Sequence, residues 1–332
     1  MPHAERFTID TVQKHGDWRD DLFRDGFVVL KGLISTEDSE RYKQNMFSWL
    51  EKFPFGFDRN DEKTWTPEYL PTHMKGGMYH GYAVQHERFM WEARQRGEPN
   101  EGSREPKVIE AFEKLWGTKD LLVSFDGMNF TLPSHPRPAT EPWPHIDQSP
   151  TRLGLQCVQG ILNFAPNGPQ DGGLMVMKGS HKLSEEFFSA HADVLGRKTW
   201  GPGDWFGFEP EEVKWFEGKG CELLKVCAGV GDVILWDSRT VHYNVLPESE
   251  NIRALIYACY TPASFATPDD LGKKAELFDQ RKGTTHWPHA NIYPNDEKKL
   301  RLGKPDVNER DRPFEEPEMN DVVLKLAGRL AY

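Results

Sequence analysis

The stretch GDVILWDSRTVHYNVLPESENIRALIYACY, residues 231–260, decides the fold. Turn residues at Gly231 and Asp232 precede an apolar run typical of a buried strand, and a short polar stretch then leads to His242. After a second turn, PESEN, Arg253 begins another strand, RALIYACY. Two consecutive antiparallel strands would bring His242 and Arg253 close together. The segment therefore predicts an antiparallel β core that carries polar side chains at its strand ends.

A His-x-Asp pair occurs three times in the chain, at His15 and Asp17, His145 and Asp147, and His191 and Asp193. Side chains at positions i and i+2 share one face only in an extended strand. The pair at 191 lies in LSEEFFSAHADVL, which has a helical apolar period, and the pair at 15 lies in the polar segment HGDWRDD. Pro142 and Pro144 instead keep the chain extended up to His145, and the strand-forming run GLQCVQGILNF follows. Only this pair is expected to chelate an ion.

His242 completes a set of two imidazoles and one carboxylate with His145 and Asp147. A lone histidine in an apolar strand is more often a satisfied core residue, but the order and spacing of these residues favour a metal site. The set is the one that holds Fe(II) on one face and leaves the other face open for substrates and oxygen. Arg253 begins so apolar a strand that we expect an anionic partner, and its fork suits a dicarboxylate cosubstrate. Arg239 is the alternative, but its offset of three from His242 puts it on the other face of an extended strand.

Several separated segments together resemble the phytanoyl-CoA dioxygenase-like family of Fe(II)/2-oxoglutarate oxygenases. They are GFVVLKGLI (26–34), the His145 and Asp147 pair, DGGLMVMKGSHK (171–182), GDVILWDSRTVH (231–242) and the strand that begins at Arg253. The ordered set is much more specific than any one of its members. The resemblance implies a mainly β fold with flanking helices (α+β), whose core is a double-stranded β-helix, or jelly roll.

Carried over residue by residue, the resemblance implies roles for individual side chains. His145, Asp147 and His242 would be the catalytic iron ligands, and Arg253 would bind the distal carboxylate of 2-oxoglutarate. Asn163 and Asn244 would lie near the cosubstrate. His181, in the turn Gly179–Ser180–His181, reads as structural rather than as a ligand.

The same resemblance implies the chemistry. 2-Oxoglutarate would chelate Fe(II), O2 would take the remaining position, and oxidation of a substrate C–H bond would release succinate and CO2. Hydroxylation is the default outcome, with desaturation or cyclisation as alternatives, and Asp147 argues against a halogenase. The family's acyl-CoA recognition segments do not align with this chain, so the chemistry transfers better than the substrate. We expect a small organic molecule.

Composition agrees with one enzyme domain over residues 1–332, with a helical and mixed support at about 1–120, a jelly-roll core at about 121–265 and a C-terminal extension at about 266–332. The net charge of -11 and the pI near 5.6 disfavour nucleic acid or an anionic membrane as partners. No apolar run is long enough to span a bilayer, and the start MPHAERFTID lacks an apolar signal segment. These features predict a cytoplasmic protein with reduced cysteines. The oligomeric state does not follow from the sequence.

Further side chains are candidates for the substrate pocket. Asp126 and Asn129 stand among apolar residues in LLVSFDGMNFTLP, with turn contacts as the alternative, and Gln148 directly follows the predicted ligand Asp147. The insertion at about 183–226 predicts either a lid over the metal or a separate packed cluster, because it is rich in aromatic residues: Trp200, Trp205, Phe206, Phe208, Trp215 and Phe216. Loop histidines that are candidates for substrate contact are His80, His286 and His289.

Two other functions fit parts of the pattern. A metal-dependent hydrolase could use the same histidines and aspartate on zinc with an activated water, but it would not require Arg253. A non-catalytic jelly-roll protein could use the cleft only for ligand recognition, and it would fold normally without oxygen-dependent turnover. The complete ligand set favours the oxygenase.

Overall fold

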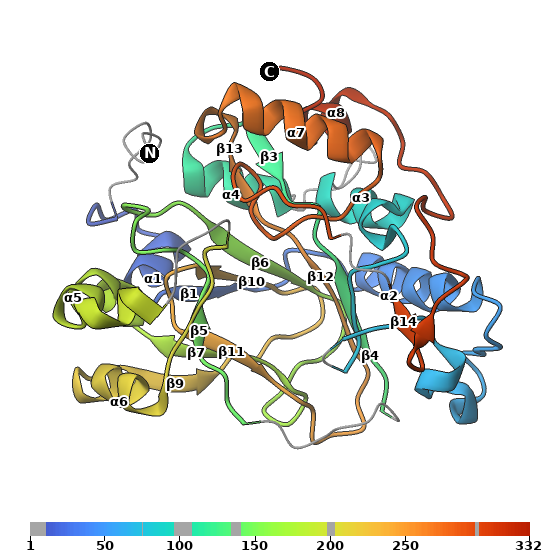
Figure 1. Cartoon of the computed structure of the whole chain (residues 1–332), viewed down its shortest axis with the longest axis horizontal. Coiled ribbons are helices and arrows are strands. Elements are labelled where there is room, and N and C mark those ends of the chain that lie inside the picture. The colour runs from blue at the N-terminus through green and yellow to red at the C-terminus, as the bar shows by residue number, and fades with distance from the viewer. Residues whose placement is uncertain (1–10, 75, 96–107, 134–140, 198–202, 296–298) are drawn as a thin grey trace.

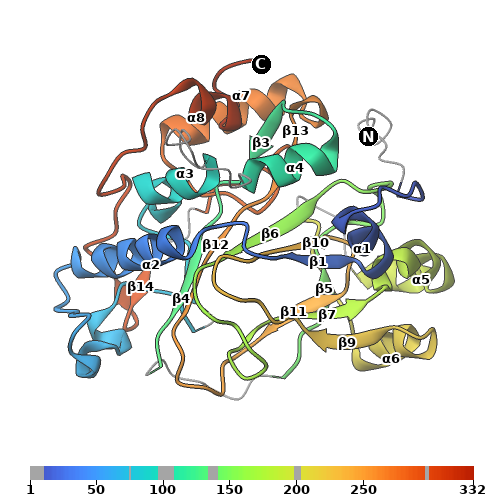
Figure 2. The same ribbon diagram turned by 180° about the vertical axis from the view of Figure 1, so that it is seen from behind.

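Two antiparallel β-sheets lie one above the other and form a jelly roll, which confirms the predicted fold class (Figures 1 and 2). The computed structural model describes residues 11–74, 76–95, 108–133, 141–197, 203–295 and 299–332. The six-stranded sheet has the order β1 (Phe27–Leu30), β10 (Val233–Asp237), β6 (Val158–Asn163), β12 (Arg253–Tyr257), β4 (Met128–Thr131) and β2 (Met78–Tyr79). The five-stranded sheet has the order β8 (Phe206–Gly207), β5 (His145–Ile146), β11 (His242–Val245), β7 (Gly173–Lys178) and β9 (Glu222–Lys225).

Both faces of the six-stranded sheet are covered, so its central strands are buried along their whole length and largely apolar on both faces. Ile234 of β10 and Leu255 of β12 point toward the second sheet and pack there with Val176 of β7. Their neighbours Leu235 and Ala254 belong to a separate core on the outer face. Because successive side chains alternate, Arg253 shares the inner face with Leu255. The space between the sheets therefore receives the polar residues at the strand ends.

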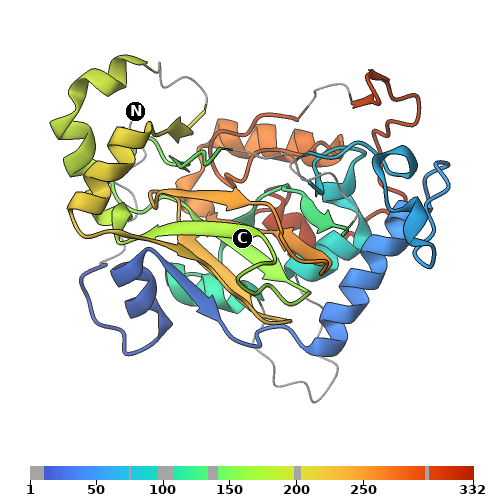
Figure 3. The same ribbon diagram turned by 90° about the horizontal axis from the view of Figure 1, so that it is seen from below.

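Helices cover the outer face of the six-stranded sheet, and α5 and α6 lie at the opposite end of the molecule from α2 (Figures 1 and 3). The α-helices are α1 (Trp18–Asp25), α2 (Thr36–Glu51), α3 (Arg88–Gln95), α4 (Val108–Trp116), α5 (Ser184–Ala190), α6 (Pro210–Gly218), α7 (Pro268–Asp279) and α8 (Asp321–Leu326). Short 3-10 helices are Glu62–Thr64, Pro67–Tyr69, Val84–His86, Ser180–Leu183, Ala192–Arg197 and Ala263–Phe265. Two small sheets complete the fold: β3 (Leu121–Val123) with β13 (Tyr260–Pro262), and β14 (Leu300–Arg301) with β15 (Lys304–Pro305).

The sequence around α2 contains both a capping residue and an apolar stripe, the two features that favour a helix packed on a sheet. The side chain of Ser35 accepts a hydrogen bond from the backbone N–H of Asp38, which caps the first turn. Tyr42, Met46 and Leu50 follow at helical spacing and are all buried against the sheet. The predicted cap and the predicted apolar stripe are both confirmed.

The aromatic insertion forms a packed cluster of its own for the most part. Phe206, Phe208 and Phe216 pack with Phe187 of α5 and with Ile146, on the face of β5 opposite to His145. The lid interpretation is therefore wrong for most of these residues. Trp205 is the exception because it lines the central cavity, and Trp200 lies outside the described residues.

The C-terminal helix α8 docks as its pattern predicts. Asn320 accepts from the N–H of Val323 at its start, and Val323, Leu326 and Ala327 are buried. The helix packs against β3 and α3 rather than near the space between the two sheets. Beyond it the hydroxyl of Tyr332 donates to the carbonyl of Leu121.

Deletion of residues 330–332 should lower stability and leave metal binding unchanged. The deletion removes the hydrogen bond of Tyr332 to Leu121, and a bond of this kind contributes about 1 kcal/mol. Leu330 is 40% exposed, so its loss adds little. Thermal unfolding and Fe(II) titration of the truncated chain check both statements. A weaker Fe(II) affinity without a lower melting temperature would contradict this structural role.

Two further predictions concern the cysteines and the possibility of a membrane-spanning helix. Cys157 and Cys259 are buried and unbridged, as their place in apolar strands predicts. Among the described residues, no helix combines the length and the apolar character needed to cross a membrane. The single-domain organisation and its boundaries remain a prediction.

Candidate metal centre

Two neighbouring strands place the two candidate histidine ligands side by side. His145 begins β5 and His242 begins β11, and the two residues face one another directly in the antiparallel pairing. Both are buried, and the centroids of their rings are 4.3 Å apart. The register of two short strands therefore produces the convergence of imidazoles that the sequence predicts.

Asp147 adds a carboxylate to this pair. Its Oδ2 lies 3.1 Å from Nε2 of His242 and 3.7 Å from Nε2 of His145. One donor atom from each residue fits within a mutual distance of 4.8 Å, and no other such cluster of three or more donors occurs in the part of the chain that the structure describes. The other two His-x-Asp pairs do not form a site: His15 lies beside Asp20, and the ring of His191 bonds the carbonyl of Phe187.

Each imidazole is oriented by a backbone carbonyl two residues earlier. Nδ1 of His145 lies 3.1 Å from the oxygen of Trp143, and Nδ1 of His242 lies 2.8 Å from the oxygen of Thr240. A carbonyl oxygen only accepts, so Nδ1 must carry the proton and Nε2 keeps its lone pair. This is the arrangement in which histidines bind metals, with the second nitrogen held by the protein.

The carboxylate of Asp147 is also held in place. Oδ2 accepts from the side-chain amide of Gln159 at 2.9 Å, and the backbone oxygen accepts from the indole N–H of Trp287 at 3.2 Å. Burial opposes ionisation, but the charges of His286 and His145 outweigh it and hold the pKa of Asp147 well below its usual value. Burial, and then the charge of His242, lower the pKa of His145. The centre therefore supplies an ionised carboxylate, and the lowered pKa of His145 favours its neutral imidazole, the form that binds a metal.

Gln159→Leu should weaken Fe(II) binding because it removes the hydrogen bond that orients Asp147. Loss of such a supporting residue typically costs roughly 10–100-fold in metal affinity. Gln156→Leu is the matched control, since the side chain of Gln156 is also buried but bonds the carbonyl of Leu153 instead. Anaerobic Fe(II) titration separates the two variants. An equal loss of affinity in both would show that Gln159 acts only through stability.

A cavity of about 460 Å³ opens beside the three donors. Its walls are largely aromatic and come from several elements: Trp143, Trp205, Trp236, Tyr257 and Tyr293. The ring of Trp143 stacks on that of His145 with a centroid distance of 4.6 Å and an interplanar angle of 5°. Histidines at the same cavity are His80 and His286. The metal centre thus faces a space large enough for a small organic molecule.

A second cavity of about 300 Å³ shares Met78, Trp143, Asn244 and Tyr257 with the first and ends at Arg253. Three buried polar atoms at this end have no hydrogen-bond partner in the protein, namely Oδ1 of Asn244, Nε of Arg253 and the hydroxyl of Tyr257. Buried polar groups are normally paired, so such a concentration indicates a polar ligand.

The electrostatics of this second cavity favour an anion. No carboxylate among the described residues pairs with Arg253, although its exposed fraction is only 7%. Burial, followed by the nearby positive charge of Arg253, lowers the pKa of Lys225 to about 8. Gly173 faces the guanidinium with φ +95°, and a Cβ there would lie 3.0 Å from Nε of Arg253. The backbone therefore leaves room for the arginine, and the uncompensated charge stabilises a carboxylate beside it.

The remaining predicted residues divide into two groups. Asp126 lines the first cavity, and Asn129 and Asn244 line the second. Asn163 and Gln148 line neither, because their amides are used in the protein. Asn163 donates to the carbonyls of Ala165 and Gly229, and Gln148 donates to those of Arg152 and Gly154. These contacts are structural, and they do not support the cosubstrate and pocket positions predicted for the two amides.

Other candidates are explained by contacts inside the protein. The guanidinium of Arg239 pairs with the carboxylate of Asp237, so it does not compete with Arg253. His289 bonds the hydroxyl of Thr261, and Nε2 of His181 bonds the carbonyl of Phe23. His181 is thus structural, as its turn predicts.

Sequence reasoning missed several side chains that shape the centre. Gln159 supports Asp147, Trp143 stacks on His145, and Tyr257 joins the two cavities. Gln159 carried a signal that we did not use: it is a polar residue within the apolar strand β6, where it needs a buried partner. Trp287 carried no comparable signal, because its contact with Asp147 spans 140 residues of sequence.

A carboxylate and two imidazoles at the open end of a jelly roll define the class of non-haem iron oxygenases. Residues 22–245 match the phytanoyl-CoA dioxygenase (PhyH) family. The chain is also 42% identical over 289 residues to the Ava biosynthesis cluster protein O of Aspergillus versicolor, which covers 86% of this chain and 91% of that protein. The chain therefore belongs to the phytanoyl-CoA dioxygenase family.

Solved structures share the fold. A hypothetical protein from Escherichia coli aligns with 89% of this chain and 79% of its own, with a TM-score of 0.54 and 15% identity. EctD from S. alaskensis with bound Fe aligns with 79% of this chain and 84% of its own, with a TM-score of 0.50 and 15% identity. The family uses Fe(II), 2-oxoglutarate and O2 and acts on small molecules. The chain is accordingly an oxidoreductase of the Fe(II)/2-oxoglutarate-dependent class.

Proposed function

We propose that the chain oxidises a C–H bond of a small natural product at an iron centre held by His145, Asp147 and His242. The observation that carries this assignment is the convergence of three buried donor atoms on one wall of a cavity. Fe(II) bound there, together with 2-oxoglutarate and O2, supplies the oxidising equivalents, and succinate and CO2 are released. Trp143 and the carbonyl of Thr240 fix the two imidazoles, so the ligands need no rearrangement when the ion binds.

Arg253 is proposed to bind the distal carboxylate of 2-oxoglutarate. The buried guanidinium lines a cavity that shares four residues with the cavity at the metal centre, and this supports a bridging cosubstrate. Asn244 and Tyr257 present polar atoms without protein partners along the same wall and would complete the contacts. The apolar neighbours Met78 and Leu246 exclude water from the charge pair, which strengthens it.

The aromatic cavity is proposed to bind the prime substrate. Its rings offer stacking surfaces for a molecule with a flat or apolar part, and His80, Asp126 and His286 offer polar contacts. The relative from Aspergillus versicolor is named for a biosynthesis cluster, which supports a biosynthetic intermediate as substrate. Hydroxylation is the proposed outcome, and desaturation and cyclisation are the alternatives. Asp126 keeps its proposed place in the substrate pocket, whereas Asn129 lines the cavity proposed for 2-oxoglutarate.

The two rival functions explain less of the molecule. A hydrolase would use the metal centre but leave the unpaired charge of Arg253 without a role. A binding protein would not need three donors held in a metal-binding protonation state. The cytoplasmic location and the absence of nucleic-acid or membrane partners stay predictions.

Anaerobic reconstitution tests the proposal. The full chain is loaded with Fe(II) and 2-oxoglutarate, a panel of biosynthetic aromatic intermediates is added, and oxygen starts the reaction. We expect succinate in an amount that follows oxygen uptake, and one panel member should gain the mass of one oxygen or lose two hydrogens. The same protein loaded with Zn(II) is the control and should form no succinate. Hydrolysis products with either metal, and no succinate, would favour the hydrolase instead.

A further inference from the structure

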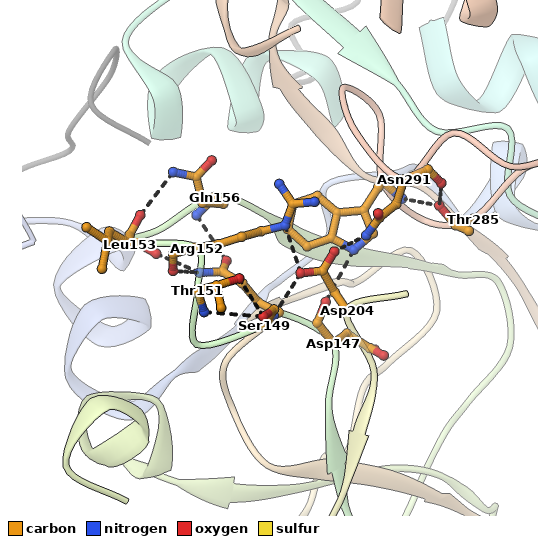
Figure 4. A network of polar contacts seen from close by, with 12 residues as sticks. Asp147, Ser149, Thr151, Arg152, Leu153, Gln156, Asp204, Thr285 and Asn291 are labelled. Carbon is orange, nitrogen blue, oxygen red and sulfur yellow. Dashed lines mark hydrogen bonds and ion pairs between the residues drawn. The ribbon is translucent and has the colours of Figure 1, made fainter. Parts of the chain in front are cut away.

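Three segments that are distant in the sequence meet at the carboxylate of Asp204 (Figure 4). One oxygen accepts from the backbone N–H of Ser149 at 2.8 Å and from Nε of Arg152 at 2.7 Å, both in the loop that follows Asp147. The other oxygen accepts from the side-chain amide of Asn291, in the C-terminal extension. Asp204 is only 6% exposed, so these bonds are strong and costly to leave unmade.

The contacts continue from Asp204 to the metal centre. The guanidinium of Arg152 lies 4.6 Å from the ring centroid of Trp287. The indole N–H of Trp287 donates to the backbone oxygen of Asp147. On the same side, the hydroxyl of Thr285 donates to the carbonyl of Asn291 and accepts from the N–H of Trp287. Residues 147–152 and 285–291 are therefore held together around one carboxylate.

The segments that Asp204 joins also carry walls of the substrate cavity. Trp205 is the next residue in the chain, lines the cavity and lies 5.8 Å from the ring of His145. His286 and Tyr293 line the same cavity from the extension. Displacement of Asp204 would thus move two segments that line the cavity.

Asn291 is suited to this contact in two ways. Its backbone has φ +49°, in the left-handed region that asparagine and aspartate enter more readily than other residues with a side chain. Its amide then donates to Asp204. Exchange of Asp and Asn between these positions would keep both the backbone preference and one N–H···O bond, which provides a specific test.

We propose that Asp204 is a positioning residue: its carboxylate fixes Trp205 and the extension as walls of the substrate cavity and, through Arg152 and Trp287, holds the backbone of Asp147. The proposal rests on the iron-binding function proposed above. It adds a requirement: the buried carboxylate of Asp204 holds in place both the loop that follows the metal ligand Asp147 and the segments that line the substrate cavity. A loosened network would weaken the metal centre without altering any ligand.

The test is a double-mutant cycle of Asp204→Asn and Asn291→Asp. The first change places two amides opposite one another, and the second places two carboxylates there. Hydrogen exchange of the Fe(II)-loaded chain should quicken about tenfold in residues 147–152 and 285–291 in each single variant. Fe(II) affinity should fall roughly tenfold, as it does when the support of a ligand is lost. The double variant should recover both values to within about threefold, because the N–H···O bond is restored.

Glu186→Gln is the matched control, because it removes an exposed carboxylate paired with Lys219 in the same insertion. It should change neither the local exchange nor the Fe(II) affinity. The proposal is overturned if the single variants equal this control, or if the double variant is no better than the singles. If Asp204→Asn does not fold, the comparison of Asn291→Asp with the Glu186→Gln control tests the proposal by the same two measurements. A wild-type chain that forms no succinate refutes the proposed function, and the exchange data then still decide the role of Asp204 in joining the segments.

Discussion

His145→Ala, Asp147→Ala and His242→Ala should each lower Fe(II) affinity by more than about 100-fold, since loss of a merely supporting residue already costs roughly 10–100-fold. Each change removes one of three donors that lie within 4.8 Å of one another. Asp147→Ala also removes the one anionic donor of the set and leaves two neutral imidazoles, which hold a dication less well. Succinate formation should fall to the background of the metal-free protein.

Histidines of similar appearance provide the controls. His15, His181 and His191 belong to His-x-Asp pairs or to a buried turn, but their contacts lie elsewhere: His181 bonds Phe23 and His191 bonds Phe187. Their alanine variants should keep full Fe(II) content, although His181→Ala should lower the melting temperature because its ring is buried. Elemental analysis paired with succinate release distinguishes the outcomes. Full iron and full turnover in the variant at His145 or His242 would overturn the site.

The candidate metal centre could be predicted because its geometry is mostly local. Pro142 and Pro144 make the chain extended, so His145 and Asp147 share a face, and this holds without knowledge of any distant contact. The pairing of β11 with β5, which brings His242 to His145, did not follow from the sequence. The sequence predicted that the strand at His242 pairs with the strand that begins at Arg253, but these strands, β11 and β12, lie in different sheets. The capped helix α2 was predictable because its signals are also local, whereas the jelly roll was implied by the resemblance to the family.

The surroundings of the centre depend on contacts that no local pattern contains. The aromatic residues of the insertion are equally compatible with a lid and with a packed cluster, because composition does not say which face of a sheet they cover. Asp204 and Trp287 act through partners 55 and 140 residues away, respectively. Asn163 was predicted from the family resemblance and Gln148 from its place beside Asp147, but their amides donate to backbone carbonyls.

Arg253→Leu should raise the concentration of 2-oxoglutarate needed for half-maximal turnover by at least about 30-fold. Truncation of one partner of a buried charge pair costs about 2–5 kcal/mol, and 1.4 kcal/mol corresponds to a factor of ten. Fe(II) affinity measured without 2-oxoglutarate should stay near the wild-type value, since Arg253 is not among the clustered donors. Succinate formation at a series of 2-oxoglutarate concentrations checks the first statement, and Fe(II) titration checks the second.

Arg239→Leu is the matched control because Arg239 is a partly buried arginine just after the end of the core strand β10. Its guanidinium already binds the carboxylate of Asp237, with Nη2 and Oδ2 at 2.7 Å. Loss of Arg239 leaves a buried carboxylate unpaired and should lower the melting temperature, while the dependence on 2-oxoglutarate stays unchanged. If Arg239→Leu alters that dependence and Arg253→Leu does not, the assignment of the cosubstrate site is wrong.

The difference between the two arginines also predicts an effect that does not require turnover. Arg253 is buried and has no carboxylate partner among the residues that the structure describes, so a ligand that supplies a carboxylate should stabilise the folded chain. Under anaerobic conditions with Fe(II), 2-oxoglutarate at 100 times its dissociation constant should add about 2.7 kcal/mol to the free energy of unfolding. The increment should be retained in the Arg239→Leu variant and should fall below about 1 kcal/mol at the same concentration in the Arg253→Leu variant, because 2-oxoglutarate binds at least about 30-fold more weakly there. 2-Oxopentanoate, which keeps the 2-oxo acid group but lacks the distal carboxylate, should stabilise neither the wild-type chain nor the Arg253→Leu variant to this extent.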